Sequence, residues 1–355
     1  MTEKTGKETA LDQLLQSARV GWTPWPGSAV GPVLLDKDWR HPVRNYGTKS
    51  FWGVVGSRSV VSAWSGMVIA REGLWISNGG HADYGGNEWY CFDLVTGRWE
   101  RKTEPSRLIK GLQVPKDDGS SFMLPIPEDG RALRGHVYGS PVVLADGRVL
   151  TVNPVPFAMG HMYFDEHVQN AWIFDPDTLE EHPAPIDFNG MGGCARLGNG
   201  NVLFATNGGV TVLDPGLNRI LSQSGGGLGF ACGYDPGPRM AIGGVWSPKL
   251  GVAVLDPSES RVLSHKYVDA PVRLTYAGVL PCGDGVFALF GEEGDVWLFD
   301  AVGERWQQHT YPNAPDTGRL CNKIQWLPGG KAAVCIPNDE QQPVHVFVPD
   351  FEVNI

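Results

Sequence analysis

The feature that most constrains this chain is an Asp that ends an apolar stretch and recurs along the sequence. Phe or Leu precedes the Asp and another apolar residue precedes that, so we expect each stretch to be a strand buried on both faces. Turn-forming residues follow, and a second strand is expected to begin six positions after the Asp. The five copies are YCFDLVTGRW (Asp93), WIFDPDTLEE (Asp175), TVLDPGLNRI (Asp214), AVLDPSESRV (Asp256) and WLFDAVGERW (Asp300).

A tight-turn signal between two apolar runs gives an independent count of the repeating units. It occurs six times, in VIAREGLWISNGG, VVLADGRVLTVNP, ARLGNGNVLFATNGG, CGYDPGPRMAIGG, LPCGDGVFALFG and QWLPGGKAAVCIPN. The last copy precedes VHVFVPDFEVN, which is a weaker sixth version of the Asp strand. A hairpin followed by a second strand pair spans about 40 to 50 residues, the size of a four-stranded propeller blade. The chain is therefore predicted to be all-β and to form a six-bladed β-propeller.

Seven blades are the alternative, because the interval between Asp93 and Asp175 is long enough to contain another unit. Only one hairpin signal lies within that interval, and we interpret residues 106–134 as an irregular insertion.

The N-terminal region is expected to close the ring. Residues 18–26 (ARVGWTPWP) resemble the outer strands RWERKTEP and RWQQHTYP, which also have a Trp followed by a Pro. We expect this segment to pair as the fourth strand of the last blade; the alternative is that residues 351–355 complete that blade alone. Residues 1–17 form an extension, in and just after which Leu11, Leu14, Leu15 and Ala18 have helical spacing. So short a helix must dock on the propeller or on a partner.

Composition limits the possible functions. The chain has 355 residues with a net charge of -10, which disfavours binding to nucleic acid or to anionic membranes. It has no apolar run long enough to cross a bilayer and no secretion signal at its start, so we expect synthesis in the cytoplasm without a signal peptide. The six cysteines lie in strand-like stretches without metal-binding spacing. We interpret them as buried thiols, and we expect no metal and no cofactor.

One segment resembles a known repeat. GGHADYGGNEWYCFDLVTGRW is similar to a kelch repeat, with a Gly pair, an aromatic residue beside an Asp, and a Trp that begins the last strand. Galactose-oxidase-like propellers and kelch-like proteins of bacteria and tailed phages have the same pattern. The resemblance implies a propeller fold, but such propellers include both binding modules and enzymes. Copper radical chemistry of the galactose-oxidase type is not expected here, because the cysteines lie in strands and no secretion signal is present.

Long connections are predicted on one face of the disc, where recognition usually takes place. They comprise residues 27–60, 106–134 and 154–168. The first contains aromatic and Arg residues typical of interface hot spots and sugar platforms, although it can also be a flap that covers the core. These binding candidates are Trp39, Arg40, His41, Arg44 and Tyr46.

Two further loops contain candidates. HADYGGNEW offers His81, Asp83, Tyr84, Asn87 and Glu88, of which His81, Asp83 and Glu88 are weak candidates for acid–base catalysis. The alternative is that Asp83 and Asn87 cap loop backbone while His81 and Tyr84 pack against their neighbours. HMYFDEH adds Tyr163 as a binding candidate, but its histidines fit no common metal spacing, and an ordinary polar loop is the favoured interpretation of this segment. We interpret the internal residues Trp172, Trp246, Trp297 and Trp326 as blade packing.

These features favour a non-catalytic interaction propeller. We expect a structural or receptor- or glycan-binding component of a larger assembly, such as a phage tail, and therefore a virion location. Other subunits would bind through the N-terminal extension or the loop-rich face, and a cell-surface glycan is a further candidate partner. The alternatives are a carbohydrate hydrolase or lyase and an intracellular kelch adaptor.

Overall fold

The Asp of each repeat copy shapes the turn after its strand. In the computed structural model, Asp93 Oδ1 accepts hydrogen bonds from the backbone N–H groups of Val95 and Thr96, both at 2.8 Å. Asp256 Oδ1 accepts a bond of 2.7 Å from the N–H of Ser260, and the other three copies bond the backbone of their own turns. Short polar side chains favour such positions because they satisfy turn backbone groups locally. The sequence repeat is therefore a repeat of turns.

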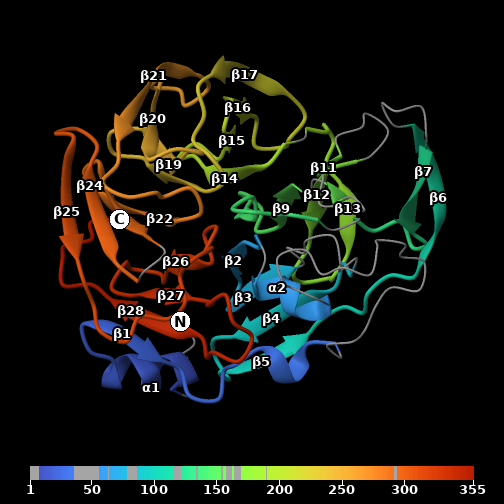
Figure 1. The fold of residues 1–355 in the computed structure, drawn as a ribbon, viewed down its shortest axis with the longest axis horizontal. Helices are drawn as coiled ribbons and strands as arrows, with labels where there is room; N and C mark the ends of the chain where they lie inside the picture. Colours follow the sequence, from blue (N-terminus) through green and yellow to red (C-terminus); the bar gives the residue numbers. More distant parts are fainter. Residues whose placement is uncertain are drawn as a thin grey trace, which may run out of the picture.

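The structure describes residues 8–35, 56–62, 64–77, 86–115, 121–132, 135–152, 155–156, 162–163, 169–188, 190–291 and 294–355. These residues form six four-stranded antiparallel sheets arranged around a common axis (Figure 1). The prediction of a six-bladed β-propeller is confirmed, and the seven-bladed alternative is wrong. The innermost strands of neighbouring blades contact one another around the whole ring.

The blades follow one another in chain order. The first contains β2 (Met67–Ala70), β3 (Gly73–Ser77), β4 (Trp89–Asp93) and β5 (Arg98–Arg101). The second contains β8 (Val142–Val143), β9 (Val149–Val152), β12 (Ala171–Phe174) and β13 (Glu181–Pro183). The third contains β14 (Gly192–Arg196), β15 (Val202–Thr206), β16 (Gly209–Leu213) and β17 (Ile220–Gly225). The fourth contains β18 (Cys232–Asp235), β19 (Met240–Gly244), β20 (Lys249–Leu255) and β21 (Val262–Asp269). The fifth contains β22 (Gly278–Gly283), β23 (Val286–Phe290), β24 (Val296–Asp300) and β25 (Arg305–His309).

The sixth blade combines both ends of the chain. It contains β26 (Ile324–Trp326), β27 (Ala333–Cys335), β28 (His345–Val348) and, as its outermost strand, β1 (Gly21–Pro24). β1 pairs antiparallel with β28, so that Trp22 lies opposite Phe347 and their ring centroids are 4.9 Å apart. The predicted closing strand is confirmed, and the alternative that residues 351–355 complete the blade alone is wrong.

The N-terminal helix docks on the propeller itself. α1 (Ala10–Ser17) begins at Thr9, whose side chain caps the helix while the Asp12 carboxylate accepts from the Thr9 backbone. The N–H of Ala10 donates to the carbonyl of Val95 at 2.8 Å, and Leu14 is buried in the cluster that joins the first and sixth blades. The predicted helix is thus present, and the first blade supplies the surface that it needs.

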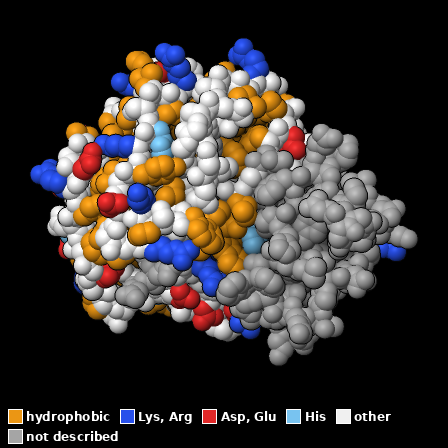
Figure 2. Space-filling view, turned by 45° about the horizontal axis from the view of Figure 1, so that its top comes forward, with side chains coloured by type: hydrophobic (Ala, Val, Ile, Leu, Met, Phe, Trp, Pro, Cys, Tyr) orange, Lys and Arg blue, Asp and Glu red, His pale blue; other side chains and the backbone are white. Residues whose placement is uncertain are grey.

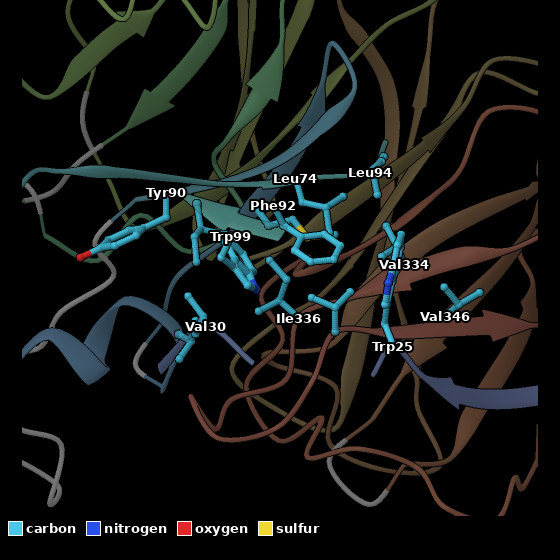
Figure 3. Packing of buried hydrophobic residues seen from close by; sticks show 14 of the residues in the cluster. Trp25, Val30, Leu74, Tyr90, Phe92, Leu94, Trp99, Val334, Ile336 and Val346 are labelled. Carbon is cyan, nitrogen blue, oxygen red and sulfur yellow. The ribbon is translucent and has the colours of Figure 1, made fainter. Parts of the chain in front are cut away.

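Aromatic residues of the first blade pack that junction. Figure 3 shows Phe92 and Trp99 from the first blade near Val334 and Trp25. The Trp25 ring meets Phe92 edge to face at 4.8 Å, while Trp99 Nε1 donates to the carbonyl of Ser28 at 2.7 Å. A buried Trp whose N–H is satisfied contributes large apolar area without leaving an unpaired polar group.

The two faces of the disc differ as predicted. In the described part of the chain, the turns within a strand pair are short and lie on one face of the disc. The connections between the pairs and between blades begin and end at the other face, which we call the loop-rich face. The short helices η1 (Gly31–Val33), η2 (Gly56–Arg58) and α2 (Ser59–Ser62) precede the first blade. β10 (Val155–Pro156) pairs with β11 (Met162–Tyr163) between strands of the second.

One prediction about the insertions is wrong. Residues 106–134 are not irregular throughout, because β6 (Leu108–Pro115) and β7 (Ser121–Pro127) pair there as a hairpin outside the blades (Figure 1). The prolines in these segments weigh against predicting strands there from the amino-acid sequence. Each strand of a two-stranded ribbon has a free edge, however, and proline is tolerated there.

Candidate functional site

The segments that enter the innermost strands bring aromatic side chains together at the axial end of the loop-rich face. Trp64 precedes β2, Tyr138 precedes β8, Phe230 precedes β18 and Tyr276 precedes β22. Their rings contact one another and two further residues. We call the set of Trp64, His136, Tyr138, Phe230, Trp246 and Tyr276 the axial aromatic cluster.

Most rings of the axial aromatic cluster are stacked. Tyr138 stacks on Phe230 with centroids 4.6 Å apart, and Phe230 stacks on Tyr276 at 5.4 Å. Trp64 stacks on His136 at 4.8 Å, and His136 Nδ1 lies 3.0 Å from the hydroxyl oxygen of Tyr138. Residues from four blades therefore form one continuous apolar layer over the axis.

Backbone contacts between blades hold this layer in place. The N–H of Tyr138 donates to the carbonyl of Trp64 at 2.8 Å, and that of Cys321 donates to Tyr276 at 2.9 Å. Trp64 and Tyr138 both have positive φ, 48° and 46°. Such backbone is uncommon in non-Gly residues and often occurs at functional sites. Gly66 completes the tight approach, because a Cβ there would lie 2.0 Å from the carbonyl oxygen of Tyr138.

Trp246 extends the axial aromatic cluster to the protein surface. It follows β19, and its ring meets Phe230 and Tyr276 edge to face at 5.5 and 5.9 Å. The residue is nevertheless 59% exposed, so the interpretation of Trp246 as blade packing is wrong. That interpretation holds for Trp172, which is 8% exposed, whereas Trp297 and Trp326 are half-buried. Space-filling shows hydrophobic side chains that reach the surface beside Lys and Arg side chains (Figure 2).

Two guanidinium groups lie against these rings. Arg273 lies 5.2 Å from the centroid of the Trp246 ring, and its Nε donates to Thr275 Oγ1 at 3.0 Å. Arg319 lies 4.8 Å from the centroid of the Trp64 ring. Burial raises the pKa of the Tyr276 hydroxyl, whereas both arginines act to lower it. Within the part of the chain that the structure describes, neither arginine forms a salt bridge with a carboxylate.

A buried lysine supports the cluster from below. Lys323 is 0% exposed, and its Nζ donates to the carbonyls of Arg319 at 2.9 Å and Ser65 at 3.2 Å. Burial lowers the pKa of Lys323 to about 8. The lysine therefore ties together the two segments that position Arg319 and Trp64.

A central cavity runs along the innermost strands. It has a volume of about 600 Å³ and is lined mainly by apolar side chains, with Arg196 as the one charged side chain among the described residues that line it. Polar side chains also bridge its walls. Gln325 accepts from the N–H of Ile69 at 3.0 Å and donates to the carbonyl of Met67 at 2.8 Å, which joins the sixth blade to the first.

Most residues predicted from the sequence to form a site lie outside the described residues: Trp39, Arg40, His41, Arg44, Tyr46, His81, Asp83 and Tyr84. Tyr163 is the last residue of β11. Asn87 is buried and bonds the backbone N–H of Ser106 and the carbonyl of Ala132. Glu88 is also buried, and its carboxylate accepts from the hydroxyl of Tyr90 at 2.8 Å. The described members of this loop therefore make internal contacts.

Sequence reasoning missed the axial aromatic cluster. Its members are far apart in the chain, and none belongs to a local motif. The available signal was positional, because an aromatic residue precedes the innermost strand of several blades.

The structure also bears on metal sites, membrane spans and cysteine pairing. In the described ranges, no three His, Cys, Asp or Glu side chains come together as a metal site would require. Nor does any helix of those ranges have the length and apolar character needed to span a membrane. The six cysteines are buried and unpaired with one another, which confirms their interpretation as buried thiols.

No family model and no curated protein matches this sequence. Among solved structures, an auxiliary nutrient binding protein from Bacteroides ovatus ATCC 8483 aligns with 82% of this chain and 70% of its own chain. The TM-score is 0.54 and the identity 9%, so the similarity concerns the propeller fold alone. A chain in a mitotic checkpoint complex covers 57% of this chain and 60% of its own at 12% identity, but its TM-score of 0.39 is too low to bear on the argument.

Proposed function

We propose that this protein is a non-catalytic binding propeller whose ligand site is the axial aromatic cluster. The observation that carries the proposal is Trp246, a large apolar side chain that is 59% exposed while it rests on the buried ring of Phe230 and the partly buried ring of Tyr276. A rigidly supported, exposed indole is an anchor for a ligand with an apolar face. The site occupies the axial end of the loop-rich face, where recognition is concentrated in propellers.

The ligand class that fits is a carbohydrate. One face of a pyranose ring is a patch of C–H groups that packs on an aromatic ring, while its hydroxyls bond polar side chains at the edge. Stacked rings held by backbone hydrogen bonds lose little conformational freedom when such a ligand binds. The nutrient binding protein named above is compatible with a binding role for this fold.

A wider context is part of the same proposal. The Gly pair, the Asp93 strand and Trp99 support a kelch-like origin, and we place the protein in a larger assembly such as a phage tail. The N-terminal extension or the periphery of the loop-rich face would contact the other subunits. Co-purification of the protein with virus particles, detected by mass spectrometry, tests this part; recovery only as a free monomer contradicts it.

Glycan binding is tested with an array followed by calorimetry on the glycans that bind. Trp246→Ala should weaken binding about tenfold or more, corresponding to about 1.4 kcal/mol. The matched control is Leu263→Ala, which removes a side chain that is 55% exposed on β21 of the same blade and should leave affinity unchanged. Equal affinity of Trp246→Ala and the wild type would refute the assignment of the site. Turnover of a bound glycan would instead favour the hydrolase or lyase alternative.

A further inference from the structure

The two arginines of the site have a more specific implication. Arg273 lies on the indole of Trp246, and Arg319 lies on the indole of Trp64. The centroid of the Tyr276 ring is 5.9 Å from that of Trp246 and 6.3 Å from that of Trp64. From this arrangement we infer that the ligand is an acidic carbohydrate, a hexuronate whose carboxylate is bound by these arginines. The inference rests on the proposed binding site.

The charge balance supports an anionic ligand. The protein has a net charge of -10, yet neither arginine has a carboxylate partner among the residues that the structure describes. By contrast, Arg71, Arg101 and Arg305 lie within 2.8 Å of Asp or Glu oxygens. A guanidinium that lies on an aromatic face keeps free N–H donors at its edge. Two of these parallel N–H groups can donate to the two oxygens of one carboxylate.

The two kinds of side chain fit two parts of one ligand. The aromatic layer suits the C–H face of the sugar ring, and the guanidinium groups suit the carboxylate at the edge of that ring. A small inorganic anion would leave the exposed Trp246 without a role, and a neutral sugar would leave the arginines without one. The Arg273 guanidinium is held by its bond to Thr275, and Lys323 anchors the backbone of Arg319 by donating to its carbonyl.

The test compares acidic sugars with matched neutral sugars. Trisaccharides of galacturonate, glucuronate and mannuronate, together with their methyl esters, are titrated into the full-length protein by calorimetry. The ester keeps the ring and removes the charge. We expect at least one acid to bind at least tenfold more tightly than its ester, with an affinity that falls as NaCl is raised.

Variants assign the effect to the two arginines. Arg273→Gln and Arg319→Gln should each weaken binding of the acid about tenfold and weaken binding of its ester by a clearly smaller factor, because the ester has no charge for the guanidinium to bind. Arg219→Gln is the control, because Arg219 is an exposed arginine in a turn on the opposite face. Thermal melting of each variant confirms that it is folded. If Arg319→Gln does not fold, Arg273→Gln and Arg273→Lys alone decide the question.

The outcomes separate this inference from the proposed function. Equal binding of acid and ester, or unchanged binding by the arginine variants, overturns the inference while the carbohydrate site stands. Failure of every acidic and neutral glycan to bind overturns the proposed function and the inference with it. Binding of acids that survives Trp246→Ala places the anion site elsewhere and also overturns the inference.

Discussion

Replacing Lys323 by Met should change how stability depends on pH. The native pKa of Lys323 is lowered by burial to about 8, whereas the unfolded chain has the ordinary value of 10.5. Between these values the unfolded state binds a proton that the native state does not, so this lysine makes stability rise with pH. Because one pKa unit is about 1.4 kcal/mol, the contribution of Lys323 increases by about 1 kcal/mol from pH 7 to pH 9.

The measurement is urea unfolding of wild type and Lys323→Met at pH 7, 8 and 9. Burial raises the pKa of the thiols, which makes stability fall as pH rises above their ordinary value, but this contribution is common to both proteins. The free energy of unfolding of the wild type minus that of the variant should therefore increase by about 1 kcal/mol over this range. Lys331→Met, which changes an exposed lysine of the same blade, is the control and should show no such trend. A difference that is constant from pH 7 to pH 9 would refute the reasoning.

Three further predictions concern the ring itself. Trp22→Ala should lower the free energy of unfolding by about 3 to 5 kcal/mol because it empties a buried site in the closing strand, whereas Val20→Ala, at a position that is 59% exposed, should have little effect; chemical denaturation distinguishes them. Gln325→Leu should cost about 1 to 2 kcal/mol, since it leaves the N–H of Ile69 and the carbonyl of Met67 without their partner, and a melting temperature equal to that of wild type would contradict this. The buried thiols should react with Ellman's reagent far more slowly in the native protein than in guanidinium chloride, and a rapid native phase would show that at least one thiol is accessible.

The fold could be predicted because its determinants are local. Asp93 and its equivalents each shape a turn within a few residues, and this pattern survives even where Trp99 is replaced by Ile220 or Val262 in other copies. Ring closure was also predictable, since the segment containing Trp22 resembles the outer strands of other blades. The hairpin of β6 and β7 was missed because its prolines are tolerated only where strands have free edges.

The candidate site could not be predicted because its determinants are distant in sequence. Trp64, Tyr138, Phe230 and Tyr276 meet only because the ring brings successive blades to one axis. Trp246 looks in sequence like any Trp next to a strand, and its exposure depends on where the turn after β19 places it. A local pattern contains no information on that placement.

The pairing of β1 with β28 has a consequence for biogenesis. Among the strands that the structure describes, β1 leaves the ribosome first, and its partner β28 is made last. Until β28 has been made, Trp22 therefore remains an apolar side chain on an unpaired strand, at risk of association with neighbouring nascent chains. Synthesis of β28, rather than folding of any single blade, is the event that ends this exposure.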